Sequence, residues 1–141
     1  MLGGDKTRGI YVLVLLVSKE ISVRVGSLGT LTFSSGLYAY VGSAQSDLER
    51  RVARHFSREK RVFWHIDYLL KNEHVYIQNV FFKVAPKTEE CLLAKAMSRL
   101  YEPIKDFGSS DCDCPSHLFK VDGCKEFDGF LRKMGLKILK L

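Results

Sequence analysis

The sequence has few of the features that mark secreted, membrane-spanning or disordered chains. It contains three prolines, four cysteines and one tryptophan, and its longest apolar run extends only from Ile10 to Val17. Lys19 and Glu20 end that run, no small-residue cleavage site follows, and the run is far too short to cross a bilayer. We therefore expect a cytoplasmic protein with no membrane partner, whose cysteines are reduced or metal-bound rather than joined in disulfides.

The composition indicates one folded domain with a basic surface. The 141 residues suit a single domain over residues 1–141, and 46% hydrophobic with 27% charged residues can supply an ordinary core. The chain shows no internal repeat or low-complexity segment. Because 22 lysines and arginines outnumber 16 aspartates and glutamates, the formal net charge is +6. This charge favours a polyanionic partner such as nucleic acid.

Apolar and alternating runs predict the strands of a small sheet. The segment Ile10–Val17 is aliphatic on both faces, which is typical of a central strand covered on each side. The short runs Ile21–Val25 and Thr30–Phe33 flank a glycine-containing turn and predict a hairpin. Leu37–Val41 is expected to be the next strand, with its two tyrosines on one face. A later strand is predicted over Val75–Val84.

A helix is predicted directly after the fourth of these strands. Ser46 and Glu49 have the spacing of a capping box, so the helix should begin here. Its buried stripe is predicted to consist of Leu48, Val52 and Phe56, at i, i+4 spacing.

Shorter patterns predict the remaining elements. Thr88 is suited to cap a helix that runs to about Tyr101. The expected core face of this helix consists of Leu92, Leu93, Ala96, Met97 and Leu100. Weaker patterns predict a helix over Trp64–Leu70 with Trp64, Ile66 and Leu69 in the core, a strand over His117–Val121, a helix over Lys125–Met134 and an edge strand over Leu136–Leu141. The expected fold class is α/β (α+β), with a small mixed or antiparallel sheet of about three to five strands flanked by helices.

Two tyrosines and a basic helix offer the groups that phosphodiester hydrolysis needs. Tyr11 and Tyr40 lie on predicted strands, and Arg51 and His55 follow four residues apart, on one face of a helix. An arginine presents a charged planar fork to phosphate oxygens, and a histidine exchanges a proton near neutral pH. Tyrosine is a poor base at its ordinary pKa of about 10, so a nearby metal or cation must lower that pKa. The alternative interpretation is core tyrosines and a solvated basic helix.

The strings that hold these residues resemble the GIY-YIG nuclease superfamily. They are Gly9-Ile10-Tyr11, Tyr40-Val41-Gly42-Ser43-Ala44 and the following helix with Arg51, Arg54 and His55. The resemblance implies that Tyr11 serves as or positions the base, beside Tyr40. It also implies that Arg51 contacts the phosphate, that His55 assists, and that a helical glutamate holds Mg²⁺ or Mn²⁺. Glu90 matches that glutamate best, with Glu89 as the alternative.

A closer resemblance links the chain to a small, largely archaeal group of uncharacterised GIY-YIG-like domains of the DUF123 type. It rests on two further strings, Phe63–Leu70 and Phe107–Leu118, and covers the chain from Gly9 to about Phe119. Some of these domains are joined to an endonuclease III-type DNA-repair glycosylase, so such an enzyme is a candidate partner. The long separation of Tyr11 from Tyr40 departs from ordinary family nucleases, so the resemblance implies the fold more strongly than cleavage.

Polar residues in and beside these strings are further candidates for a site. Ser43, His65, Asp67, Asp111 and His117 could extend the predicted active site, although an aspartate in a Ser/Gly loop is commonly a turn former. Zinc is a second candidate, because thiolates and an imidazole are a fitting ligand set. Its predicted ligands are Cys112, Cys114, His117 and Cys124. The tight Cys-x-Cys spacing favours a structural loop with reduced cysteines over zinc.

Basic residues around the predicted helix are expected to contact a nucleic-acid backbone, and they are Arg54, Arg58, Lys60 and Arg61. The leading hypothesis is a Mg²⁺- or Mn²⁺-dependent nuclease that acts on DNA or RNA, with DNA favoured and a role in DNA repair. The alternative is a non-catalytic nucleic-acid-binding or repair-enzyme accessory module on the same scaffold.

Overall fold

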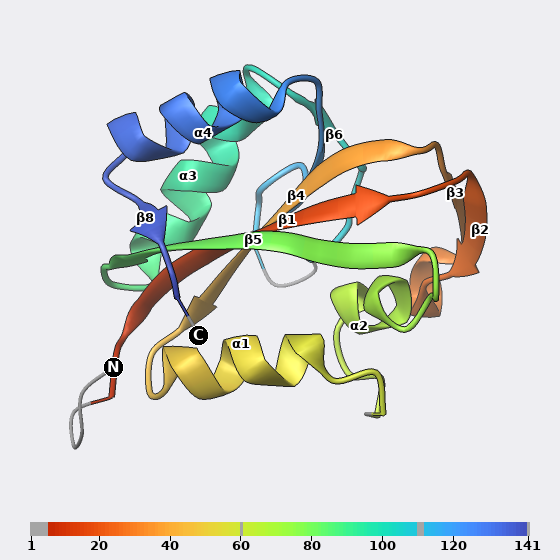
Figure 1. Cartoon of the computed structure of the whole chain (residues 1–141), viewed down its shortest axis with the longest axis horizontal. Helices are drawn as coiled ribbons and strands as arrows, with labels where there is room; N and C mark the ends of the chain where they lie inside the picture. The colour runs from red at the N-terminus through yellow and green to blue at the C-terminus, as the bar shows by residue number, and fades with distance from the viewer. Residues whose placement is uncertain (1–5, 60, 110–111, 141) are drawn as a thin grey trace.

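The computed structural model describes residues 6–59, 61–109 and 112–140. Within these residues the chain forms a six-stranded sheet with the order β6-β7-β4-β1-β5-β8 and a separate β2–β3 hairpin (Figure 1). Every neighbouring pair is antiparallel. The strands are β1 (Gly9–Val17), β2 (Ile21–Arg24), β3 (Thr30–Phe33), β4 (Gly36–Ala44), β5 (Val75–Val84), β6 (Glu102–Pro103), β7 (Leu118–Val121) and β8 (Lys137–Ile138).

Helices cover both faces of the sheet in the described part of the chain. They are α1 (Leu48–Phe56), α2 (His65–Leu70), α3 (Thr88–Ser98) and α4 (Cys124–Lys133), with a short 3-10 turn over Gly26–Leu28. Figure 1 shows α1 and α2 below the sheet and α3 and α4 above it. The α+β class is therefore confirmed, with one more strand in the main sheet than the upper end of the predicted range.

Alternation along β1 explains why this strand is apolar throughout. Tyr11, Leu13 and Leu15 belong to the core on the side of α1 and α2. Ile10, Val12 and Val14, which alternate with them along the strand, belong to the core on the side of α3 and α4. Because β1 lies between β4 and β5, both its edges are paired and both its faces are covered. The predicted central strand, hairpin and edge strand are confirmed.

The start and the buried face of α1 differ from the prediction. Asp47, not Ser46, is the N-cap, and its carboxylate accepts a hydrogen bond from the Arg50 backbone N–H. The Glu49 carboxylate instead accepts a hydrogen bond from the Thr7 hydroxyl, at 2.7 Å. Phe56 is 47% exposed, and His55 takes the inward position in the last turn.

The prediction for α3 was wrong at its cap, its end and part of its core face. Lys87 is the N-cap and makes no side-chain capping bond, and the helix ends at Ser98 rather than near Tyr101. The buried residues are Leu93, Ala94 and Met97, whereas Leu92 and Leu100 are exposed. The buried face is turned toward Ala94, so of the five predicted positions only Leu93 and Met97 are fully buried.

No helix in the described ranges combines the length and the apolar character that a membrane crossing requires.

Candidate active site

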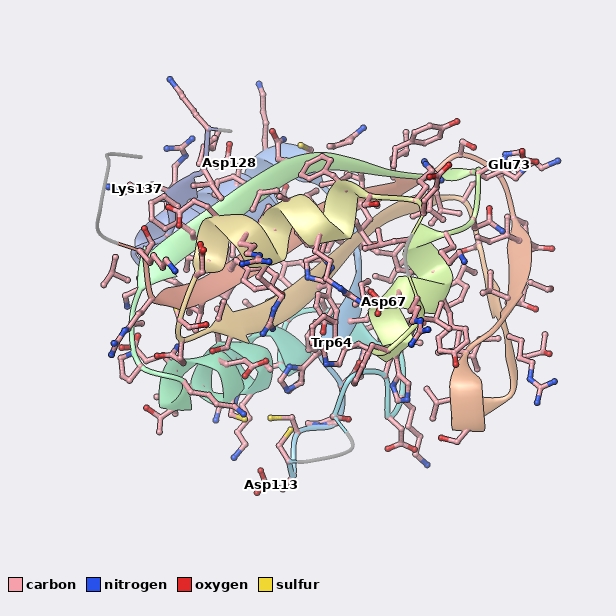
Figure 2. All side chains as sticks on the ribbon, turned by 90° about the horizontal axis from the view of Figure 1, so that it is seen from below. Trp64, Asp67, Glu73, Asp113, Asp128 and Lys137 are labelled. Carbon is pink, nitrogen blue, oxygen red and sulfur yellow. The ribbon has the colours of Figure 1, made fainter. Side chains whose placement is uncertain are left out.

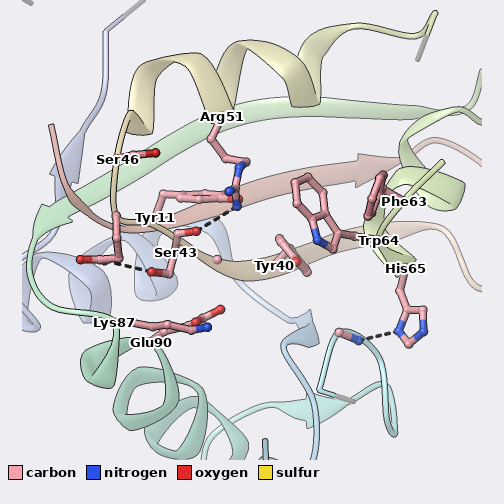
Figure 3. A pocket seen from close by; sticks show the side chains of 13 residues that line it. Tyr11, Tyr40, Ser43, Ser46, Arg51, Phe63, Trp64, His65, Lys87 and Glu90 are labelled. Atoms are coloured by element: carbon pink, nitrogen blue, oxygen red, sulfur yellow. Dashed lines mark hydrogen bonds between the residues drawn. The ribbon is translucent and has the colours of Figure 1, made fainter. Parts of the chain in front are cut away.

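A cleft of about 680 Å³ opens where α1, the start of α2 and the start of α3 meet the sheet. Figure 3 shows residues from all of these elements pointing into it. Of the predicted site residues, six line this cleft together: Tyr11, Tyr40, Ser43, Arg51, His65 and Glu90. They lie as far as 79 positions apart in the sequence, so the fold brings them together.

Tyr11 lines the cleft and forms a buried pair with His55, which is not among the cleft-lining residues and lines a separate hollow with Phe56 and Arg58. The Tyr11 hydroxyl lies 2.7 Å from His55 Nε2, and the two side chains are 1% and 2% exposed. Tyr40 packs edge-on against the same imidazole, with ring centroids 6.2 Å apart. The predicted histidine therefore lies against both predicted tyrosines.

Gly42 leaves the space that the Tyr11 side chain occupies. The register of β1 and β4 pairs Tyr11 with Gly42. A Cβ atom at Gly42 would lie 2.6 Å from the Tyr11 hydroxyl oxygen and closer still to the ring. Only glycine therefore allows the phenol to cross β4 toward His55.

Burial raises the pKa of both tyrosines. For Tyr11 the charge of Arg51 and a hydrogen bond from it oppose this effect, but burial prevails. For Tyr40 burial is again the main cause, and the neighbouring Tyr11 adds to it. Arg51 therefore does not lower the pKa of either tyrosine below its ordinary value, contrary to the expectation for a nearby cation. Both phenols are protonated near neutral pH.

Arg51 is held at the wall of the cleft by two contacts. Its Nη1 donates to the Ser43 carbonyl oxygen at 3.0 Å, and its guanidinium lies 4.5 Å from the centre of the Trp64 ring. Figure 3 shows Arg51 descending from α1 toward Ser43, above Tyr11. Trp64 was predicted to be a core residue, but it is only partly buried and lines the cleft.

Arg54 and Asp67 form a bidentate ion pair outside the cleft lining. Both nitrogen–oxygen distances are 3.0 Å, and the Asp67 side chain is fully buried. Asp67 also accepts hydrogen bonds from the backbone N–H groups of Phe63 and Trp64. In Figure 2, Trp64 and Asp67 lie on the side of α2 that faces α1. The pair therefore fixes the segment that carries the aromatic wall of the cleft.

Replacing Asp67 with asparagine should lower the free energy of unfolding by about 3 kcal/mol at neutral pH. Burial alone would raise the pKa of Asp67, but the Arg54 hydrogen bond, two backbone N–H groups and the Arg54 charge outweigh it and lower the pKa. A lowered pKa contributes stability that is present above the unfolded-state pKa and is lost as the pH falls through the folded-state pKa. Urea unfolding at neutral and acidic pH should therefore show a smaller acid-induced loss for Asp67→Asn than for the wild type.

Asp128→Asn is the matched control for this measurement. Asp128 also pairs with an arginine, Arg132, at 2.7 Å, but its side chain is 40% exposed, whereas that of Asp67 is fully buried. Its replacement should cost less than about 1 kcal/mol. Equal losses for the two variants would contradict the role assigned to Asp67.

The other predicted basic contacts are scattered. Arg58 donates to the carbonyl oxygens of Asn72 and Val75, and so ties the end of α1 to the start of β5. Arg61 is exposed and lines a different, shallow hollow. Lys60, like Asp111, lies outside the described residues. Among the described residues, Arg58 and Arg61 therefore lie apart from Arg51, whereas Arg54 lies over the same Trp64 ring as Arg51, 4.4 Å from its centre.

His65 connects the start of α2 to the loop between β6 and β7. Its Nδ1 accepts a hydrogen bond from the Gly108 backbone N–H at 2.8 Å, and Gly108 has a positive φ of 71°. Burial lowers the pKa of His65, which favours this neutral, accepting form. His65 and Gly108 both line the cleft.

Glu90, and not Glu89, lies in the cleft. Glu90 extends from the first turn of α3, with its side chain 14% exposed, and its Oε2 lies 3.2 Å from His117 Nδ1. Glu89 is paired with Lys83 at 2.8 Å. Lys87, which sequence reasoning missed, also lines the cleft near Glu90.

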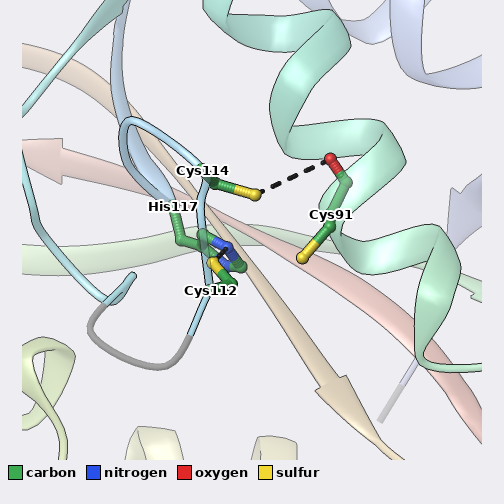
Figure 4. A group of neighbouring side chains, drawn as sticks. All are labelled: Cys91, Cys112, Cys114 and His117. Carbon is green, nitrogen blue, oxygen red and sulfur yellow. Dashed lines mark hydrogen bonds between the residues drawn. The ribbon is translucent and has the colours of Figure 1, made fainter.

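The predicted zinc ligands are brought together only in part. Cys112, Cys114 and His117 do gather, but Cys124 is exposed at the start of α4 and is not in the group. Cys91 takes its place, because α3 presents this residue to the loop between β6 and β7. The ligand atoms of these four residues lie within 4.8 Å of one another (Figure 4). Nothing in the sequence spacing pointed to Cys91.

Phe63 is a second cleft residue that the predicted site did not include. It is 80% exposed, and its ring centroid lies 5.9 Å from that of Trp64. Phe63 could have been predicted from the sequence, because it begins the string Phe63–Leu70 that carries the resemblance to DUF123-type domains.

Comparison with known proteins identifies a family without an assigned activity. No significant match was found among curated proteins or among solved structures. One family model matches residues 10–138, and so includes every cleft residue named above. The chain belongs to the family described as Domain of unknown function DUF123.

Proposed function

We propose that this protein hydrolyses phosphodiester bonds in nucleic acid with the help of Mg²⁺ or Mn²⁺, on a GIY-YIG-like scaffold. The observation that carries the proposal is the convergence of Tyr11, Tyr40, Arg51 and Glu90 on one open cleft. A base, a phosphate-binding cation and a carboxylate for a metal are the groups that this hydrolysis requires. The tripeptides that suggested the scaffold also have a physical role here, since Gly42 makes room for Tyr11.

The Tyr11–His55 pair supports a proton transfer that avoids a free phenolate. As a water molecule gives a proton to the Tyr11 oxygen, the Tyr11 hydroxyl gives its own proton to His55 Nε2, 2.7 Å away. The resulting hydroxide attacks phosphorus, and the bond to the leaving oxygen breaks. Because burial raises the Tyr11 pKa, a concerted transfer fits this site better than prior ionisation.

Arg51 is the group assigned to the phosphate. Its contacts with Ser43 and Trp64 fix its guanidinium before substrate arrives, so little reorganisation is needed. A fixed planar donor suits the equatorial oxygens, on which charge develops during the reaction.

Glu90 fits a single divalent cation. Among the described residues it is the one carboxylate in the cleft lining, and magnesium is commonly held by one or two carboxylates together with water and substrate phosphate. When bound, such an ion would offset charge on the phosphate and stabilise the leaving oxygen.

The aromatic wall supports nucleic acid over a small phosphodiester. Phe63 projects from the surface beside Trp64, and both line the cleft. Bases stack on such side chains when they are unpaired, which adds about 1–3 kcal/mol per base. We therefore expect a preference for single-stranded, nicked or abasic DNA over intact duplex.

The proposal is tested by incubating purified protein with branched, nicked, single-stranded and abasic DNA and with structured RNA. Mg²⁺ or Mn²⁺ should support cleavage of at least one of these, and a chelator should stop it. A non-catalytic nucleic-acid-binding module, the alternative hypothesis, would bind these nucleic acids with a steep salt dependence and cleave none of them with any metal ion. That outcome would overturn the catalytic proposal.

Replacing Gly42 with alanine should displace the Tyr11 phenol and abolish most of the cleavage. The overlap should also cost about 1–3 kcal/mol of folding stability. Gly129→Ala in α4 is the matched control, because a Cβ atom there meets nothing within 4 Å. It should keep full activity and gain up to about 1 kcal/mol from helix propensity. Activity and thermal melts of both variants check this, and an active Gly42→Ala protein would contradict it.

A further inference from the structure

A cluster of three thiols and one imidazole lies beside the cleft and has no role in the proposed hydrolysis. Cys91 comes from α3, and Cys112, Cys114 and His117 come from the segment that precedes β7 (Figure 4). The structure describes all four cysteines of the chain, and each is a free thiol. We infer that these four residues bind one structural Zn²⁺ ion in a Cys₃His site.

The distances suit a tetrahedral zinc ion. Zinc–sulfur and zinc–nitrogen bonds of about 2.3 and 2.0 Å place neighbouring ligand atoms about 3.5–3.8 Å apart. All four ligand atoms already lie within 4.8 Å of one another, and Cys112 Sγ lies 3.3 Å from His117 Nε2. The ligands would therefore move by about 1 Å or less to close around the ion.

The hydrogen bonds of His117 leave the correct nitrogen for the metal. Its Nδ1 lies 3.2 Å from Glu90 Oε2 and 3.2 Å from the Val41 carbonyl oxygen, so this nitrogen has acceptors for its proton. Its Nε2 faces Cys112 and the cluster. A zinc-bound histidine typically donates its other N–H to a carboxylate or carbonyl in this way, which fixes the ring and its tautomer.

Burial and ligand type identify the ion and its role. Cys114 and His117 are 5% and 3% exposed, and Cys91 and Cys112 are partly buried. Thiolates with one imidazole select zinc among the common divalent ions, and four protein ligands leave no position for a substrate. The ion would join α3 to the loop between β6 and β7, a connection otherwise made by few bonds such as Cys114 Sγ to the Cys91 carbonyl oxygen.

Metal analysis of the full chain, purified under reducing conditions from zinc-supplemented cells, tests the site. The wild type should contain about one zinc per chain. Cys91→Ser and Cys112→Ser should each contain less than about a tenth of that. Cys124→Ser is the matched control, since this thiol is exposed and outside the cluster, and it should keep its zinc.

Cobalt supplies a readout that does not depend on the folding of a variant. Wild-type protein stripped of metal should bind Co²⁺ with the sulfur-to-cobalt charge-transfer band and the visible bands of a tetrahedral thiolate site, and Zn²⁺ should displace it. Zinc removal should also lower the thermal midpoint of the wild type. A folded wild type with no zinc and no thiolate band would overturn the site, as would equal zinc loss in Cys124→Ser. These results concern metal content and not cleavage, so they stand apart from the test of the nuclease.

Discussion

Replacing Tyr11 with phenylalanine should lower the rate of phosphodiester cleavage by about 10²–10⁴-fold. The variant keeps the ring that packs in the core and loses the hydroxyl that lies 2.7 Å from His55 Nε2. Without that hydroxyl, water has no route for its proton to the imidazole. Single-turnover cleavage with excess enzyme measures the chemical step, and nucleic-acid affinity should change little.

Tyr38→Phe is the matched control for Tyr11→Phe. Tyr38 is also a buried tyrosine of the sheet, at 2% exposure, but its hydroxyl donates to the Ser34 carbonyl oxygen, away from the cleft. Both variants lose a hydrogen bond, which costs about 1–3 kcal/mol of stability when a buried partner is left unpaired. Cleavage should survive in Tyr38→Phe alone. Equal activity in both variants would remove Tyr11 from the mechanism.

Replacing Arg51 with lysine should reduce cleavage by about 10²–10³-fold, even though the charge is kept. The planar guanidinium donates to the Ser43 carbonyl oxygen and stacks on Trp64, and a lysine ammonium cannot reproduce both contacts. The loss should appear in the rate at saturating substrate more than in binding, because the proposed contact strengthens as charge develops.

Arg50→Lys tests whether this effect is specific to the cleft. Arg50 is the exposed neighbour of Arg51 on α1 and is not a cleft-lining residue. Its replacement should leave the cleavage rate within about twofold of the wild type, because the charge is kept and the lost guanidinium does not line the cleft. A loss in Arg50→Lys as large as in Arg51→Lys would show that the effect does not depend on a guanidinium placed in the cleft.

Local patterns predicted the sheet and the helices well, because burial leaves a strong periodic signal. The continuous apolar run of β1 predicted a strand covered on both faces, and it lies between β4 and β5 with a core on each side. Likewise Val75–Val84 forms β5 with the predicted bounds. These features depend on neighbours in the sequence and on one physical effect, the removal of apolar surface from water.

The structure differs from the predictions where a residue distant in the sequence determines how a side chain is placed. His55 turns inward because the Tyr11 hydroxyl lies 2.7 Å away, and Phe56 is left exposed. Asp67, which the sequence offered as a site residue, pairs with Arg54 across the α1–α2 contact. No periodicity within one element reports such a partner.

In the candidate site, too, residues within short strings were predicted, whereas contacts between distant segments were not. Tyr11, Tyr40 and Arg51 were predicted from short strings, and the fold places them in one cleft. Cys91 was not associated with the loop cysteines, because its sequence position on α3 is 21 residues from Cys112. Contacts between elements that are distant in sequence are visible only in the folded chain.

The most direct measurement is a crystal structure with Mn²⁺ and a non-cleavable oligonucleotide, in which the anomalous signal of manganese locates the ion. We predict one manganese ion coordinated by Glu90, a phosphate oxygen in contact with Arg51, and a water molecule within hydrogen-bonding distance of the Tyr11 oxygen. Manganese bound away from Glu90, or an oligonucleotide whose phosphates avoid this cleft, would contradict the account.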